Sequence, residues 1–258
     1  MLLVISALKG FTIEAADGPL GTADDFLFDD SAWRVRWLVV GTGGWLSHRQ
    51  VLVHPSAIGV ADIDRSQLPV NLTKKQVEES PEVLQGEVLT QATEDRLFRY
   101  YGWDSAGWYA EPYEPPLGAM ATPFSSPPYL GFNALIGSDI IISDGDVADP
   151  TKRSVDDVTG FHVHASDGPI GHVENFIVDS DTWRIQYLIV ATRNWWPGQH
   201  VLIAPEAVVA IKSLDRVVEI DVTRKQVKAS PPWDPLALMK QADFRSLRAH
   251  YGWPMTNY

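Results

Sequence analysis

The sequence contains no cysteine among its 258 residues. This absence excludes disulfide bonds, thiolate nucleophiles and cysteine-ligated zinc or iron–sulfur sites together. Folding therefore does not require an oxidising compartment, because there is no disulfide to form.

Long apolar segments are also missing. No run reaches the roughly 18 apolar residues that a membrane-spanning helix needs. The opening segment MLLVISALKG has too short an apolar stretch for a signal peptide, and no small-residue cleavage site follows it. We therefore expect a cytoplasmic protein that does not insert into a membrane.

Positive charge is scarce. The chain has 33 acidic residues against 21 Lys and Arg, which gives a formal net charge of -12. Binding to a phosphate backbone depends on clustered basic side chains, so we expect no nucleic-acid partner. The imbalance is strongest in residues 104–150, which hold seven acidic residues and no basic one.

Known catalytic motifs are not found either. The sequence has no Gly-x-Ser-x-Gly elbow and no His-Glu-x-x-His motif, and the glycine-rich segment 41–45 lacks the Lys-Ser/Thr of a phosphate loop. Acidic pairs at 24–25 and 29–30 fall near expected strand ends, where carboxylates usually face water. We expect no enzymatic activity and no cofactor, since no set of reactive groups converges.

The main positive feature is an internal repeat. The segment GFTIEAADGPLGTADDFLFDDSAWRVRWLVV, which starts at Gly10, aligns with GFHVHASDGPIGHVENFIVDSDTWRIQYLIV, which starts at Gly160. The Tyr-Gly-Trp tail that follows the first copy recurs after the second. Two copies predict a first module at residues 1–103, an acidic linker rich in Pro, Gly and aromatics at 104–150, and a second module at 151–258.

Each copy has the pattern of a small β domain. An alternating segment meets Asp-Gly, which predicts a hairpin, and a glycine three residues later permits a bulge or a close backbone approach. Thr73 and Gln76 have the spacing of a capping box, so a short helix should follow the last strand. Longer helices are expected at Thr93–Tyr100 and Pro235–His250. Five or six short strands per copy favour a barrel that closes to hide its edges.

These motifs resemble the PRC-barrel family, named for the cytoplasmic domain of the photosynthetic reaction-centre H subunit; a similar barrel forms the C-terminal domain of a ribosome-maturation factor. The resemblance covers residues 1–80 and 151–231 and includes a Val-Val-Gly third strand and a Val-Leu-Val-x-Pro fourth strand. It implies a mainly β fold of two tandem PRC-type barrels, each with five to six strands and followed by short helices. The motif residues are Gly10, Asp17, Gly18, Gly21, Gly160, Asp167, Gly168 and Gly171.

In function, the resemblance implies a partner-docking barrel without catalytic residues. The chain shows neither the H subunit's transmembrane helix nor the maturation factor's separate N-terminal domain, so neither role transfers directly. We expect a non-enzymatic scaffold or docking protein for an unknown protein partner, with its two modules packed by approximate two-fold symmetry. The alternatives are a small-molecule or metal-binding protein with a site between the barrels, and an accessory factor of a photosynthetic or other membrane complex.

Aromatic residues in loops are the candidate partner contacts. Trp45 and the pair Trp195 and Trp196 lie in polar or Gly/Pro-flanked segments at matching places in the two copies. Tryptophan is enriched at binding hot spots, although these rings could also cover a barrel end or pack one module on the other. For the two Tyr-Gly-Trp tails we expect a clamp onto the barrel that each follows.

A histidine group suggests a metal site only weakly. His162 and His164 are two residues apart, hence on one strand face, and imidazole is a common metal ligand. We expect the hairpin to place His172 out of line with them. The first copy has Thr12 and Glu14 in place of the pair, so a solvated polar face is the favoured interpretation and no metal is expected.

Overall fold

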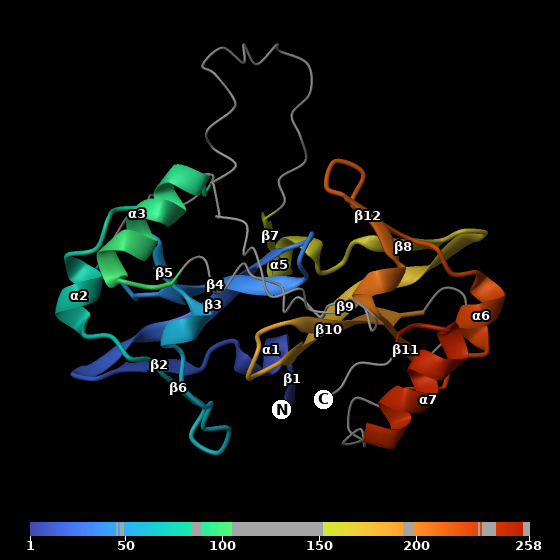
Figure 1. The fold of residues 1–258 in the computed structure, drawn as a ribbon, viewed down its shortest axis with the longest axis horizontal. Coiled ribbons are helices and arrows are strands. Elements are labelled where there is room, and N and C mark those ends of the chain that lie inside the picture. Colours follow the sequence, from blue (N-terminus) through green and yellow to red (C-terminus); the bar gives the residue numbers. More distant parts are fainter. Residues whose placement is uncertain are drawn as a thin grey trace, which may run out of the picture.

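Two β-sheets lie side by side in the computed structural model, with helices at both outer ends and near the centre (Figure 1). The structure describes residues 1–44, 46, 49–83, 89–104, 152–192, 199–231, 233 and 241–254. The first sheet has the strand order β5-β4-β3-β2-β6, with β7 paired to β3. The second has the order β11-β10-β9-β8-β13-β12, with β1 paired to β9.

The first half of the chain supplies β2 to β6 of the first sheet and β1 of the second sheet. Its elements are β1 (Leu2–Val4), α1 (Ile5–Leu8), β2 (Thr12–Ala15), β3 (Gly18–Asp29), β4 (Arg34–Gly41), β5 (Val51–Val53), the 3-10 helix η1 (Pro55–Ala57), β6 (Gln67–Pro69), α2 (Lys74–Glu78) and α3 (Gln91–Tyr101).

The second half repeats this order of elements at an offset of 150 residues and adds one strand, β12. Its elements are β7 (Lys152–Ser154), α5 (Val155–Val158), β8 (His162–Ala165), β9 (Gly168–Asp179), β10 (Ile185–Ala191), β11 (His200–Ile203), the 3-10 helix η3 (Pro205–Ala207), β12 (Val208–Lys212), β13 (Val217–Ile220), α6 (Arg224–Lys228) and α7 (Gln241–Tyr251).

Local signals in the sequence account for these elements. The Asp-Gly turn joins β2 to β3 and β8 to β9, and a proline ends β5 and β11 and opens a 3-10 helix. Thr73 and Thr223 cap α2 and α6, and both hydrogen bonds of the capping box are present in each. The short helices predicted from the Thr-x-x-Gln spacing are therefore confirmed.

A glycine in each hairpin lets two backbones approach more closely than a side chain would allow. A Cβ placed on Gly21 would lie 2.2 Å from the carbonyl oxygen of Gly41, and one on Gly171 would lie 1.9 Å from that of Ala191. Bulges between Ile13 and Glu14 and at the equivalent place in the second hairpin add a register shift beside them. Only glycine fits at these two positions.

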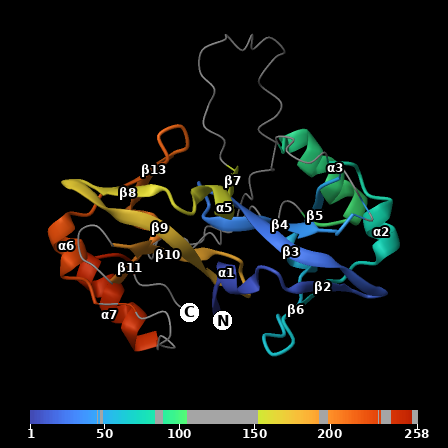
Figure 2. The ribbon, with the colours of Figure 1, turned by 180° about the vertical axis from the view of Figure 1, so that it is seen from behind.

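The two halves exchange their first strands. Strand β1 pairs antiparallel with β9, and Leu3 faces Val178, whereas β7 pairs with β3, and Arg153 faces Phe28. Strand β4 pairs with one edge of β3 from Thr22 to Asp29. On the other edge, β2 pairs with β3 up to Thr22, and β7 pairs with it from Leu27 to Asp29. Figures 1 and 2 show α5 and β7 beside β3 and β4, and α1 and β1 beside β9 and β10.

One hydrophobic core runs through both halves. Phe28 packs on Phe176 with ring centroids 5.5 Å apart, and both side chains are fully buried. The backbone N–H of Val35 donates to the carbonyl of Trp183 at 2.8 Å, and that of Ile185 donates to Trp33 at 2.7 Å. The halves therefore meet through shared backbone and side-chain contacts about an approximate two-fold relation.

The predicted mainly β fold of two modules is confirmed. The first sheet takes five strands from its own half and the second takes six, and each half ends in helices. Within the described residues the paired strands form open sheets, and no closed barrel is found. None of the helices in the described ranges combines the length and apolar character needed to cross a bilayer.

Candidate functional site at the junction of the two halves

The predicted tryptophan contacts lie outside the described residues. Trp45 belongs to the loop between β4 and β5, and Trp195 and Trp196 belong to the loop between β10 and β11. Strands β4 and β10 start next to each other at the Arg34–Arg184 bridge and run in opposite directions. Strands β4 and β10 therefore end, at Gly41 and Ala191, on opposite sides of this bridge.

The motif residues of the two hairpins make structural contacts. The Asp17 carboxylate accepts a hydrogen bond from the backbone N–H of Lys74 at 2.8 Å, at the start of α2. Asp167 accepts the equivalent bond from Arg224 at 2.7 Å. Each turn aspartate thus ties its hairpin to the following helix, whose first N–H groups have no partner within the helix.

The histidines lie on the outer face of the second sheet. His162 and His164 are exposed on β8, as the alternation predicts. The prediction for His172 was wrong, because it directly faces His162. A bulge between Val163 and His164 shifts the register of β9 by one residue and brings His172 into line. Among the described residues, no three possible ligands are grouped around one point.

The two Tyr-Gly-Trp tails fold back onto their own modules, as predicted. Tyr101 and Trp103 stack with ring centroids 4.2 Å apart, and Tyr251 and Trp253 repeat this stack at 4.2 Å. Trp103 also lies 6.0 Å from the ring of buried Trp37. The tails therefore anchor α3 and α7.

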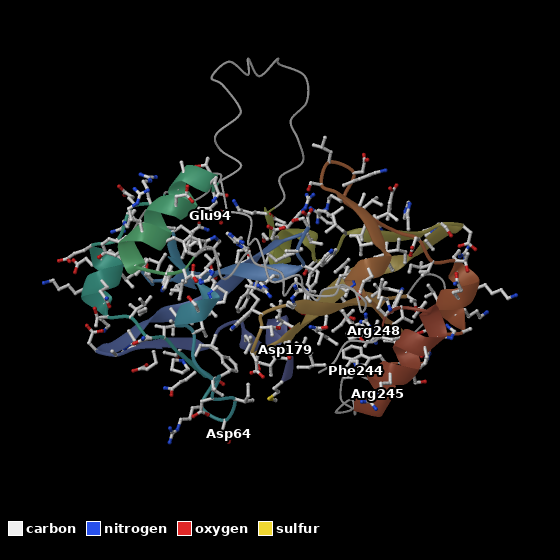
Figure 3. All side chains as sticks on the ribbon, in the orientation of Figure 1. Asp64, Glu94, Asp179, Phe244, Arg245 and Arg248 are labelled. Atoms are coloured by element: carbon white, nitrogen blue, oxygen red, sulfur yellow. The ribbon has the colours of Figure 1, made fainter. Side chains whose placement is uncertain are left out.

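A buried carboxylate connects α3 with the exchanged strand β7. Glu94, labelled beside α3 in Figure 3, has no exposed surface, and its Oε1 accepts a hydrogen bond from the indole Nε1–H of Trp37 at 2.7 Å. Its Oε2 lies 2.7 Å from the Lys152 ammonium and 3.8 Å from the Arg36 guanidinium. Burial lowers the pKa of Arg36, and the nearby Glu94 charge opposes this shift. Glu94 thereby binds β7 and β4 at once.

Arg153 provides a second charged link between the halves. It is 7 % exposed, and its Nε donates to Asp30 Oδ2 at 2.7 Å. Its Nη2 donates to the backbone carbonyl of Ile211 at 3.1 Å, and its Nη1 donates to the hydroxyl of Ser213. One guanidinium therefore joins β7, the end of β3 and the β12–β13 hairpin.

Reciprocal caps complete the junction. Asp25 accepts hydrogen bonds from the Ser154 hydroxyl at 2.5 Å and from the Asp156 backbone N–H at 3.2 Å. Asn175, the residue at the equivalent place, accepts from the Ser6 backbone N–H at 3.3 Å and donates to its hydroxyl at 2.5 Å. Burial raises the pKa of Asp25, and the hydrogen bond from Ser154 acts in the opposite direction.

His54 lies in an aromatic cluster under α3. Its ring is 4.9 Å from that of Phe98, 5.5 Å from Trp103 and 5.6 Å from Trp37, and its side chain is 1 % exposed. Burial, followed by the positive charges of Arg36 and Arg34, lowers the pKa of His54 to about 3. The imidazole is therefore neutral at physiological pH.

A cavity of about 200 Å³ opens at the junction, between the β7–α5 segment and the β12–β13 hairpin. Lys152, Arg153 and Arg216 contribute to its lining, together with Phe161, over which the Arg216 guanidinium lies at 4.8 Å. Lys152 is paired with Glu94, and Arg153 with a second carboxylate. The chemistry of the cavity is therefore polar with largely compensated charge.

The sequence interpretation missed Glu94, Lys152 and Arg153. A glutamate in an amphipathic helix normally faces water, and basic residues at the start of a strand normally do too. The sequence does contain a signal, because each of these charged residues corresponds to an uncharged residue in the other copy. Phe244 replaces Glu94, and Leu2 and Leu3 stand where the second copy has Lys152 and Arg153.

Comparison of the chain with protein families identifies one matching family. Residues 4–77 match the PRC-barrel domain family. The matched segment runs from the end of β1 through most of α2 and so includes the hairpin with Gly21. A comparison with curated proteins found no match.

Proposed function

Because the chain carries a PRC-barrel domain at residues 4–77, we propose that it is a docking protein that binds a protein partner and performs no chemistry of its own. PRC-barrel domains are protein-interaction modules in general terms. Fold alone does not fix a function, so the proposal rests on how this chain presents its surface.

The observation that carries the proposal is the joining of two modules into one body. Exchanged strands and a shared core fix the module orientation. Strands β4 and β10, which precede the segments with Trp45 and with Trp195 and Trp196, then end on opposite sides of that body. Because β4 has eight residues and β10 has seven, these two strand ends lie on the order of 40 Å apart. Such a spacing suits two docking ends better than one combined site.

The chemistry of the junction supports a non-enzymatic role. Its acids are engaged in structure, since buried Glu94 pairs with Lys152 and half-buried Asp30 pairs with Arg153. The buried imidazole of His54 is surrounded by aromatic rings and stays neutral. A general acid or base instead needs a pKa near the working pH and access to substrate.

Capture by the full-length chain from native lysate tests this proposal. Three variants are compared with wild type: Trp45→Ala, Trp195→Ala with Trp196→Ala, and all three together. The proposal expects one specific protein whose captured amount falls in each single-end variant and vanishes in the triple variant. A cytoplasmic location belongs to the same proposal, and cell fractionation checks it.

The control replaces exposed apolar residues elsewhere, Val209→Ala with Leu214→Ala, whose side chains are 67 % and 102 % exposed. This control should capture the partner normally, and all variants should unfold at the wild-type temperature. Equal capture by the triple variant and wild type would contradict the role of the tryptophans.

A small-molecule site is the second candidate, and the junction cavity is the observation that favours it. Its volume of about 200 Å³ holds only a small ligand, and Arg216 is the one exposed residue among the three cations that line it. Metal analysis of the purified protein and a thermal-shift series with small carboxylates and phosphates test this candidate. No bound metal and no shift that depends on Arg216 would remove it.

A further inference from the structure

The two copies differ in charge at the places where they touch each other. In the first half, Glu94 of α3 pairs with Lys152 of β7, and Asp30 after β3 pairs with Arg153 of β7. At the equivalent places in the second half the residues are Phe244 and Ser180, and the incoming strand β1 is Leu2-Leu3-Val4. The first side of the junction therefore has buried and half-buried side-chain ion pairs. On the second side the strand side chains are apolar, and the exposed Met1 ammonium lies near Asp179 and Asp181 at the rim.

A third ionic contact lies at the rim. The Lys9 ammonium, at the end of α1, is 2.5 Å from the Asp156 carboxylate at the start of α5. The residues equivalent to these two are Thr159 and Ser6. All three charged contacts thus have one partner in each half, and none has a charged duplicate across the two-fold relation.

Homotypic pairing would remove every one of these contacts. If two first halves met, β1 would place Leu2 beside Glu94 and Leu3 beside Asp30. Glu94 would then lose Lys152 and keep only Arg36, and Asp30 would lose Arg153. If two second halves met, Lys152 would face Phe244 and Arg153 would face Ser180. A buried charge without its partner is strongly unfavourable, so each wrong pair is penalised on both of its equivalent sides.

We propose that the junction is a heterotypic recognition interface: a first half binds a second half and rejects another first half, in one chain or between two copies. Its occupant is the complementary half of this same chain. The first sheet accepts a basic strand through Glu94 and Asp30, and the second accepts an apolar strand.

The linker decides which copy supplies the complementary half. Residues 104–150 number 47 and join the two halves covalently. Such a tether keeps the local concentration of the second half near the millimolar range. Pairing within one chain therefore dominates at micromolar concentrations, and cutting the linker exposes the interface to exchange.

The test uses the full chain with a protease site inserted between residues 120 and 130. One preparation carries an affinity tag at the N-terminus, and a second is untagged and isotope-labelled, so that every half is recognised by mass. After cleavage, the two preparations are mixed, exchanged through mild urea and captured on the tag. With equal amounts mixed, we expect labelled and unlabelled second halves to be captured in equal amounts, and labelled first halves at least 100-fold less than labelled second halves.

A symmetrised variant keeps the test decisive. The substitutions Glu94→Phe, Asp30→Ser, Lys152→Leu and Arg153→Leu give the first sheet the residues of the second. Its halves should still associate, but the tagged first half should now capture first halves at no less than one-tenth of the amount of second halves. Native mass spectrometry of cleaved mixtures that exchange without urea gives the same counts if refolding fails.

Two results for the wild-type halves, and one for the symmetrised variant, would overturn the proposal. One is separation of the cleaved wild-type halves at micromolar concentration, which would mean that the interface depends on the tether. The other is capture of wild-type first halves in amounts comparable to second halves. Unchanged selectivity in the symmetrised variant would also overturn it, because the charges would then not be the cause.

Discussion

Replacement of Glu94 by glutamine is the sharpest test of the buried ionic contact. The amide keeps the size of the side chain and an oxygen that accepts the Trp37 indole hydrogen bond, but it removes the negative charge. Lys152, with 19 % of its side chain exposed, and Arg36, with 3 %, then lose the carboxylate between them. The substitution therefore isolates the charge from the packing.

The expected magnitude follows from this geometry. Removing one partner of a buried ion pair costs about 3–5 kcal/mol, and the partial exposure of Lys152 favours the lower value, about 3 kcal/mol. For a chain of this size, such a loss lowers the unfolding temperature by roughly 6–12 °C. Guanidinium unfolding at pH 7, followed by tryptophan fluorescence and far-UV circular dichroism, measures the free energy of unfolding.

The matched control is Glu219→Gln. Glu219 pairs with Lys212 at 2.6 Å, but the two side chains are 39 % and 47 % exposed. An exposed pair contributes at most about 1 kcal/mol, so this variant should stay close to wild type. If Glu94→Gln loses less than about 1 kcal/mol, the junction is not held by this charge and the reasoning fails.

Three further predictions use the same unfolding assay. Burial lowers the pKa of His54 to about 3 in the folded chain. Below pH 6.5 the His54 imidazole is therefore protonated in the unfolded chain but stays neutral in the folded chain. This contribution to the free energy of unfolding should be fully present above pH 6.5 and should fall by up to about 1.4 kcal/mol per pH unit below it. The variant His54→Ala should show a smaller dependence on pH. Gly21→Ala should lower the free energy of unfolding by more than about 3 kcal/mol, because its Cβ would lie 2.2 Å from a carbonyl oxygen. Gly41→Ala, whose Cβ would have its nearest contact at 3.6 Å, should lower it by less than about 1 kcal/mol. Since burial raises the pKa of Asp25, Asp25→Asn, which copies Asn175, should lose no stability at pH 7 and gain up to about 1 kcal/mol; a clear loss would mean that the charge itself holds the cap.

The local structure of each module could be predicted because its signals are local. The Asp-Gly turn, the proline after the fourth strand and the Thr-x-x-Gln spacing each act within a few residues, and the structure has the predicted element at each place. The repeat then doubled every signal. His172 shows the limit, because one bulge residue changed which side chain it faces.

The exchange of β1 and β7 could not be predicted from the sequence. A three-residue segment such as Leu2–Val4 pairs equally well, by its own pattern, with either sheet. Its partner is decided by contacts far apart in the chain, such as Lys152 with Glu94 and Arg153 with Asp30. A comparison of the copies for lost charge, rather than for shared residues, would have marked these positions.

The candidate site was predicted only in part. Trp45, Trp195 and Trp196 remain predictions, since they lie outside the described residues. Glu94 and His54 were missed because both residue types usually face solvent, and only their replacement by Phe244 and Ala204 in the second copy signals burial.

The most direct test of the account is a disulfide across the exchanged strands. The natural chain has no cysteine, so Leu2→Cys with Asp179→Cys places its only two thiols on directly paired residues of β1 and β9. The matched variant is Leu2→Cys with Asp29→Cys, since Asp29 is the residue of β3 equivalent to Asp179 and pairs with Lys152 instead. Oxidation followed by mass spectrometry and gel filtration should show an intramolecular bond in the first variant and free thiols in the second. A bond that forms only in the Asp29 variant would show that β1 stays with its own sheet, and would contradict strand exchange and the single two-module body built on it.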